Sequence, residues 1–446
     1  MFTNKQLKDL IVPLIIEQFL GVLVGTMDVI MVSQVGEFAT SGVSLVDSIT
    51  NLLVQAFSAM ATGGSVIAAN YIGKRRPDQA SDAAGQLIVS NTVVGIVLMV
   101  ICLFGREFFL DKIYGSIEPA VKDSAMIYFL ITCISYPFFA MYAGGAALCR
   151  AEGNSKITMK VAIITNLINV CGNALLVMGF HMGTAGVAIP TLLARAFGAF
   201  AMLVILRRQD HPIHFHADMH YKFNFPMIKK ILKIGIPTGI DGSVFQIGKL
   251  LVASLIAGLG TASIAANAVT NTLSSIVVIP GCAMGLSLIT IVGQCIGAGE
   301  KDESIRYTKK IMLWIHGATL LMSLIIGLGS GWILKLYNLS GETYAIAQKL
   351  IITYAIAAPL CWPESFSLHN SLRAGGDAPF IMVVTLVSMW LFRIGCSYLF
   401  VKGFHMGVYG IWYAMYIDWV VRGIVFVTRF ISRKWMKLLN VKREGV

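Results

Sequence analysis

The sequence predicts an all-α integral membrane protein, with about twelve transmembrane helices in two parallel six-helix repeats. Three observations predict this class: an apolar composition, an internal repeat at a fixed spacing, and basic residues at alternate connections. Of the 446 residues, 56% are hydrophobic and 13% are charged, and the mean hydropathy is +0.75. Such a small number of polar side chains cannot cover a water-exposed surface. The chain is therefore expected to lie in a lipid bilayer.

The membrane-spanning helices are predicted from apolar runs. A run of roughly 20 apolar residues is needed to cross the hydrocarbon core as a helix. About twelve runs of this kind occur along the chain. They cover residues 11–33, 45–72, 86–107, 124–148, 157–180, 184–206, 230–256, 265–297, 308–335, 343–371, 380–402 and 406–430.

The chain repeats itself at a spacing of 224 residues. Residues 179–183 read Gly-Phe-His-Met-Gly, and the same five residues return at 403–407. The same spacing relates Pro13 to Pro237 and Glu17 to Asp241. Duplication in an apolar chain indicates a transporter, because the substrate sites of such folds lie between repeats that can move against each other. The predicted organisation is an N-lobe over 1–208, a polar cytoplasmic linker over 209–226 and a C-lobe over 227–446.

Basic residues predict the orientation in the membrane. They gather at 74–76, 150–160, 207–233, 301–310, 373 and 429–443, which are alternate connections and the C-terminus. The positive-inside rule makes these connections and both termini cytoplasmic. An even number of spans in each half then makes the two repeats parallel. The net charge of +12 is therefore mostly a topology signal, and nucleic acid is not an expected partner, because the bases flank apolar spans.

The linker contains four histidines that allow two interpretations. They are His211, His214, His216 and His220. Imidazole is a common metal ligand, but the linker has no partnering cysteine and no regular ligand spacing. A solvated loop is therefore favoured over a metal site, and neither a structural metal nor a cofactor is expected.

Carboxylates inside the spans are the strongest functional signal. Asp28 lies in the first predicted span with no base within one helical turn. A charge at mid-bilayer costs about 2.5–3.5 kcal/mol on insertion scales, so this acid should face a cavity or a bound cation. Glu17 lies eleven residues earlier, close to three helical turns, and shares the face of Asp28. Its repeat mate Asp241 also follows a proline by four residues.

Neutral oxygen ligands accompany these acids in the fifth and sixth spans. Asn169 and Asn173 are four residues apart on one helical face, and Thr191 follows Pro190 in the next span. Amide and hydroxyl oxygens beside a carboxylate suit a small hard cation such as Na⁺. Hydrogen bonds between helices are the alternative role for these side chains.

The remaining charges inside spans have structural explanations beside functional ones. The i,i+4 spacing of Asp418 and Arg422 predicts a neutralising pair. The three bases Arg195, Lys249 and Arg393 could reach toward the interface, pair with acids or line a cavity. Glu364, next to Pro363, is expected at a helix break that faces a cleft.

At this point the residues resemble the multidrug and toxic compound extrusion (MATE) family. The resemblance rests on residues 26–36 (TMDVIMVSQVG), on the Asn169 and Asn173 pair, and on two Arg-Ala-x-Gly-Asn/Asp motifs at 150–154 and 373–377. It implies two six-helix bundles that form a V-shaped cleft, and export of organic cations in exchange for Na⁺ or H⁺. It also implies that Asp28, Asn169 and Thr191 belong to a cation site.

The chain departs from that family pattern in three places. Asn173 stands where many relatives have an aspartate, while Phe245 or Gln246 and Trp362 stand where relatives of the NorM type have acids. The coupling ion therefore stays open between Na⁺ and H⁺. The expected cation site is Asp28, Asn169, Asn173 and Thr191, and the expected cleft residues are Glu17, Asp241, Gln246, Lys249, Glu364 and Arg393.

We therefore expect a monomeric secondary antiporter of the cell (plasma) membrane that exports organic cations by alternating access. A flippase for lipid-linked precursors is the alternative, because Lys249, Arg195 and Arg393 could hold phosphates. An enzyme is not expected, since the sequence lacks H-E-x-x-H and G-x-S-x-G motifs.

Overall fold

The computed structural model describes residues 2–114, 118–208, 212–213, 223–337 and 339–439, and over this part of the chain the regular structure is entirely helical. The described residues form two compact units, which divide between Gly239 and Ile240. Large apolar side chains lie on the outside of both units, among them Phe104 (89% exposed) and Leu328 (83%). An apolar exterior of this kind suits contact with lipid.

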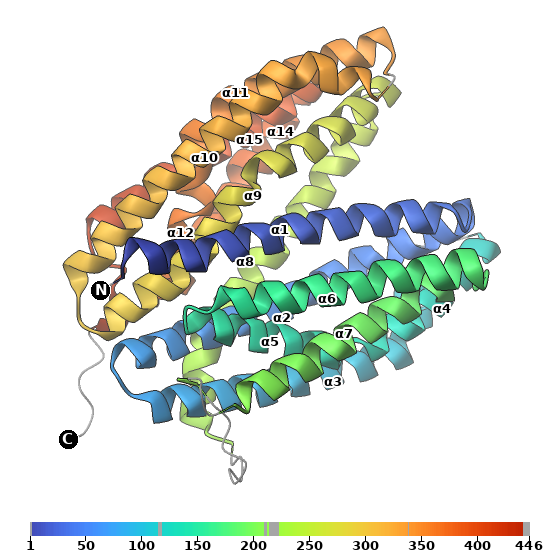
Figure 1. Ribbon diagram of the computed structural model, residues 1–446. Coiled ribbons are helices and arrows are strands. Elements are labelled where there is room, and N and C mark those ends of the chain that lie inside the picture. The colour runs from blue at the N-terminus through green and yellow to red at the C-terminus, as the bar shows by residue number, and fades with distance from the viewer. Residues whose placement is uncertain (1, 115–117, 209–211, 214–222, 338, 440–446) are drawn as a thin grey trace. The chain divides into compact units, whose positions relative to one another are not determined.

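The helices of the N-terminal unit pack side by side, and α7 contacts α4, α5 and α6 (Figure 1). Helix α1 lies beside α6, and α2 lies beside α3, α4 and α5. Aromatic side chains such as Phe57, Phe129 and Tyr136 fill the core of this unit and are fully buried. The helices are α1 (Asn4–Ser33), α2 (Glu37–Gly73), α3 (Pro77–Tyr114), α4 (Pro119–Ile134), α5 (Tyr136–Ala151), α6 (Ser155–Asn173), η1 (Ala174–Gly179) and α7 (Ala185–Leu206).

The C-terminal unit has α10 beside α9 and α11, and α15 beside α11. Helix α8 begins in the N-terminal unit and continues into this one, since the division falls between Gly239 and Ile240. The helices are α8 (Phe225–Ala257), α9 (Thr261–Gly297), α10 (Lys301–Lys335), α11 (Gly341–Phe366), α12 (Leu368–Ala374), α13 (Ala378–Ser388), η2 (Met389–Gly395), α14 (Cys396–Tyr398), η3 (Leu399–Gly403), α15 (Gly407–Ile431) and η4 (Lys437–Leu439).

Every predicted span coincides with one of these helices or with a run of successive helical segments. Within the described residues, ten helices are long and apolar enough to cross a membrane, or eleven if the pair α4 and α5 is one span bent by 47°. Pro137 lies at the start of α5, where it has no helical N–H to donate. Helix α15 matches the last predicted span, 406–430, and carries the charged residues Asp418, Arg422 and Arg429.

The duplication is visible in the backbone. A π-helix, η1 or η3, precedes each Gly-Phe-His-Met-Gly segment. His181 and His405 then take positive φ angles of 51° and 53°, and Gly183 and Gly407 take 59° and 57°. Positive φ is costly for a residue other than glycine, so its presence at both histidines shows that the two repeats make the same turn.

The boundary between the predicted lobes stays a prediction. Most of the linker, including all four of its histidines, lies outside the described residues. The metal interpretation of those histidines therefore also stays open. Among the residues that are described, there is no group of three or more His, Cys, Asp or Glu side chains that could hold a metal ion.

Candidate functional site

Asp28 is held by a side-chain amide from another helix. Asn173 Nδ2, at the end of α6, donates a hydrogen bond of 2.7 Å to Asp28 Oδ1 on α1. Asp28 is half-buried, whereas Asn173 is fully buried. Within the described part of the chain Asp28 makes no ion pair. One oxygen of the Asp28 carboxylate is thus held by a hydrogen bond, while the side chain stays partly accessible.

The predicted oxygen ligands form a chain of hydrogen bonds behind Asp28. Asn173 Nδ2 also donates to Asn169 Oδ1 (3.3 Å), and Asn169 Nδ2 donates to Thr191 Oγ1 (3.0 Å). These contacts join α6 to α7, which is the interhelical role that the sequence left as an alternative. Asn173 Oδ1 is buried and has no hydrogen-bond partner among the described residues. That oxygen is suited to accept a hydrogen bond or to coordinate a cation, so the two roles are compatible.

A second carboxylate, Asp47 on α2, belongs to the same site and was missed by the sequence analysis. Tyr128 Oη on α4 donates to Asp47 Oδ1 at 3.2 Å, and the charges of Asp47 and Asp28 act on each other. The available signal was an acid in the apolar run 45–72, which is the same signal that singled out Asp28.

Arg195 on α7 is the basic member of this group. Its Nη1 donates to Ser135 Oγ at 2.6 Å, and its guanidinium lies 5.1 Å from the centre of the Phe139 ring. Its charge acts on both Asp28 and Asp47. Two carboxylates and one guanidinium leave a net charge of −1 when both acids are ionised. The group can therefore take up one further positive charge.

The π-helix η1 begins at Ala174, directly after Asn173. A π-helix inside an α-helix is often found at a functional site, because the wider turn re-aims the neighbouring side chains. Here it follows the residue that binds Asp28.

Glu17 and Asp241 each form an ion pair with the arginine of a repeated motif. Arg150 Nη1 lies 3.1 Å from Glu17 Oε1, and Thr158 Oγ1 donates to Glu17 Oε2 at 2.8 Å. Arg373 Nη2 lies 2.9 Å from Asp241 Oδ2. Each pair joins the first span of its repeat to the fourth. Protein groups therefore contact both carboxylates. Whether Glu17 and Asp241 also line a cleft stays a prediction.

The expected cleft residues of the C-terminal unit have different surroundings. Gln246 is half-buried, and Lys249 is exposed with its Nζ 5.8 Å from the centre of the Phe245 ring. Arg393, on η2, is half-buried. Whether these side chains line a substrate cleft stays a prediction.

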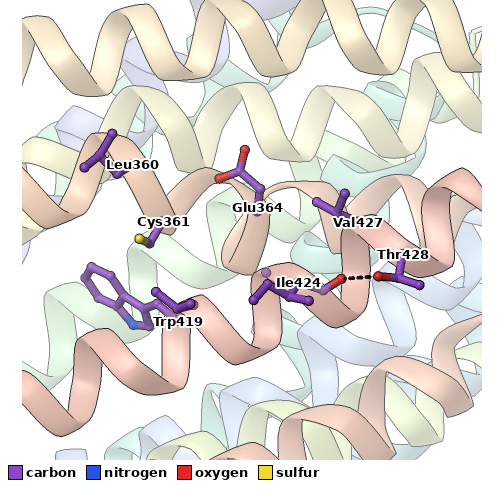
Figure 2. Close-up of a pocket in the computed structure, with 9 residues that line it drawn as sticks. Leu360, Cys361, Glu364, Trp419, Ile424, Val427 and Thr428 are labelled. Atoms are coloured by element: carbon purple, nitrogen blue, oxygen red, sulfur yellow. Dashed lines mark hydrogen bonds between the residues drawn. The ribbon is translucent and has the colours of Figure 1, made fainter.

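Glu364 lies beside a histidine that the sequence analysis did not consider. His316 Nε2 on α10 is 2.6 Å from Glu364 Oε1, and His316 Nδ1 is 2.7 Å from the Pro359 carbonyl oxygen. Figure 2 shows Glu364 and Cys361 of α11 among the residues that line a pocket together with residues of α15. The pocket has a volume of about 280 Å³ and is lined mainly by apolar side chains, including Trp419 and Ile424.

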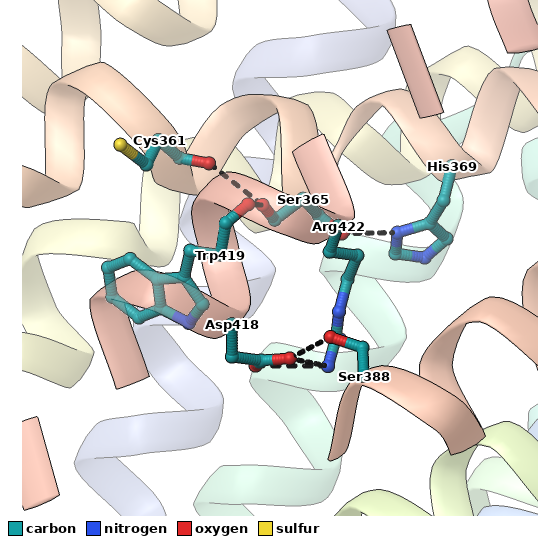
Figure 3. Close-up of polar contacts among 7 residues, drawn as sticks. All are labelled: Cys361, Ser365, His369, Ser388, Asp418, Trp419 and Arg422. Carbon is teal, nitrogen blue, oxygen red and sulfur yellow. Dashed lines mark hydrogen bonds and ion pairs between the residues drawn. The ribbon is translucent and has the colours of Figure 1, made fainter. Parts of the chain in front are cut away.

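The predicted pair of Asp418 and Arg422 is confirmed. Arg422 Nη2 lies 3.1 Å from both carboxylate oxygens of Asp418, and Ser388 Oγ also donates to Asp418 (Figure 3). Both charged residues are buried, with 0% and 3% of their side chains exposed. The pair contributes no net charge, because the two charges cancel. The hydrogen bond from Ser388 links α15 to the end of α13.

Comparison with known proteins decides the family. The MatE family model matches residues 13–175 and again residues 237–399, which together make up most of the chain. The chain belongs to the MatE family. The two matches are themselves 224 residues apart, which is the spacing of the internal repeat. The MatE resemblance proposed from the sequence is therefore confirmed.

Relatives match this MatE chain along nearly its full length. The "Uncharacterized transporter YisQ" of Bacillus subtilis (strain 168) is 28% identical over 437 residues, which are 95% of this chain and 93% of that protein. The "Probable multidrug resistance protein NorM" of Thermotoga maritima is 24% identical and covers 99% of this chain and 95% of its own length. Among solved structures, a MATE transporter from Vibrio cholerae has a TM-score of 0.89 at 17% identity, over 96% of both chains.

Membership in the MatE family establishes the general class of this protein. It is a multi-pass membrane protein of a transporter family, and that family is not one of enzymes. The likeness to the solved structures supports the predicted all-helical fold of two repeated halves.

Proposed function

We propose that this MatE-family protein exports organic cations across the plasma membrane, in exchange for Na⁺ or H⁺, with Asp28 as the exchanging group. The observation that carries the proposal is the half-buried Asp28 carboxylate inside a polar group of net charge −1. A site of this charge favours either a coupling ion or a cationic cargo, and it becomes neutral when one cation binds. Relatives that are named as probable multidrug resistance proteins support the same proposed function.

The proposed mechanism is alternating access of a monomer, with competition at one acid. When Asp28 holds Na⁺ or H⁺, the protein favours one of its two conformations, which is open to one side of the membrane. When it is empty, a cationic cargo is bound instead. Asn169, Asn173 and Thr191 supply the neutral oxygens around the ion, and Asp47 adds the second negative charge. The membrane potential contributes about 2.3 kcal/mol per charge per 100 mV, which is enough to bias such an exchange.

The orientation is part of the proposal. Both termini are assigned to the cytoplasm because the basic connections fall on one side of the predicted spans. Asp28 then lies in the outer half of α1, five residues before the helix ends at Ser33.

Efflux of ethidium from cells that carry Asp28→Asn tests the proposal. We expect gradient-driven efflux to be lost at an unchanged amount of protein in the membrane, and Asp47→Asn to impair it as well. The matched control is Asp9→Asn, which alters an acid of the same helix whose side chain is 42% exposed and is paired with Lys156 at 2.8 Å. Efflux by Asp28→Asn at the rate of the control would reject the role of Asp28.

The coupling ion is tested separately. Replacing Na⁺ by choline at fixed pH should stop efflux if Na⁺ is exchanged, whereas a protonophore should stop it if H⁺ is exchanged. Efflux that responds to neither treatment would reject antiport. A purified protein that binds undecaprenyl pyrophosphate and no organic cation would instead favour the flippase.

A further inference from the structure

The two repeats differ in charge at equivalent positions. With the spacing of 224 residues, Asn169 of the cation site corresponds to Arg393, and Asp28 corresponds to Val252. Gly25, one turn before Asp28, corresponds to Lys249. The N-terminal repeat thus has an acid and an amide where the C-terminal repeat has an aliphatic residue and two bases.

The structure brings these C-terminal residues together. Val252 of α8 belongs to one apolar cluster with Met389 and Ile394 of η2. The charges of Lys249 and Arg393 act on each other. Arg393 lies on the π-helix η2. The equivalence inferred from the sequence therefore also holds for the packing of α8 against η2.

Neither base is neutralised by the protein. Within the residues that the structure describes, the side chains of Arg393 and Lys249 make no ion pair and no hydrogen bond. The nearby acid, Asp418, is already held by two contacts from Arg422 and by Ser388. A half-buried guanidinium beside a second positive charge is costly in a membrane unless an anion joins it.

The depth of Arg393 argues for a ligand anion over a lipid phosphate. Arg393 lies ten residues before the end of the span at Gly403, which corresponds to about 15 Å along a helix. Lys249 lies eight residues before the end of α8 at Ala257, or about 12 Å. The hydrocarbon core is about 30 Å thick, so these groups lie well below the headgroups.

We infer that Arg393 and Lys249 form an anion subsite in the C-terminal unit that binds the carboxylate, or a similar oxyanion, of an organic ligand. Arg393 supplies the planar donor pair that suits a carboxylate. Lys249 supplies a second charge from α8. The inference deepens the proposed function, on which it rests, because it assigns the residues that would hold the carboxylate of a zwitterionic cargo.

Two fluorescent dyes that differ by one methyl group test the subsite. Rhodamine 110 has a free carboxylate, and rhodamine 123 is its methyl ester. Binding to the purified full-length protein is measured by fluorescence anisotropy. We expect Arg393→Gln to weaken the binding of rhodamine 110 about ten-fold, as loss of a charged hydrogen bond should, and to leave rhodamine 123 unchanged. Arg393→Lys should restore part of the difference.

Controls separate this result from unfolding and from lipid binding. Lys402→Gln removes an exposed base from the same span and should not alter the ratio of the two dyes. Equal weakening of both dyes by Arg393→Gln, or of neither, would overturn the inference. The inference would also be overturned if wild type and Arg393→Gln bound the two dyes in the same ratio and differed only in their binding of added phosphatidylglycerol.

The test is independent of export. The ratio of acid to ester binding is read without a gradient, so it can fail while Asp28→Asn still abolishes efflux. Conversely, Arg393→Gln could change the ratio of acid to ester binding as expected while Asp28→Asn shows normal efflux. That result would reject the proposed exchange and retain the subsite.

Discussion

Replacing Asp418 by asparagine should strongly destabilise the C-terminal unit. The Asp418 side chain is fully buried and that of Arg422 is 3% exposed, with 3.1 Å between Nη2 and Oδ1. At this distance and an effective dielectric constant of 20, the attraction between unit charges is about 5 kcal/mol. Asp418→Asn removes it and leaves a buried guanidinium without its counter-ion. We expect the free energy of unfolding to fall by about 3–5 kcal/mol.

The assay is denaturation of the detergent-purified protein by sodium dodecyl sulfate, followed by tryptophan fluorescence, because Trp419 lies next to the altered residue. The double variant Asp418→Leu/Arg422→Met should recover most of the loss, since it removes both charges. Asp111→Asn breaks the exposed contact of 2.6 Å with Lys122 and should cause no measurable change. If Asp418→Asn were as stable as Asp111→Asn, the reasoning about this buried pair would be refuted.

Further predictions concern the equivalent pairs of the two repeats and one close helix contact. Glu17→Gln and Asp241→Asn should each lower the free energy of unfolding by about 1–3 kcal/mol in the same denaturation assay. The loss should be larger for Asp241→Asn, because its arginine partner is 8% exposed, against 21% for the partner of Glu17. Gly63→Val should lower the melting temperature, since a Cβ at this position would lie 2.5 Å from the Ile231 carbonyl oxygen. A Gly63→Val protein as stable as wild type would contradict this contact.

The helices and their duplication could be predicted from the sequence because each depends on local pattern. Apolar runs define spans wherever the chain meets lipid, and a repeated segment can be recognised without any contact. The pair of Asp418 and Arg422 was predictable for the same reason, because residues four apart on one helix are neighbours. Asp28 could also be singled out, since an acid in an apolar run is costly wherever the helix packs.

Only the tertiary structure decided which charges meet. Glu17 contacts Arg150 across 133 residues, and Asn173 contacts Asp28 across 145. Helical periodicity shows which face of a helix a residue occupies, but it does not show which helix lies opposite. For this reason the sequence analysis could not find Arg150 as the partner of Glu17, and it overlooked Asp47. A carboxylate that faces an arginine, such as Glu17, forms an ion pair that joins two helices. Asp28 instead accepts a hydrogen bond from an amide and belongs to a group whose net charge stays negative.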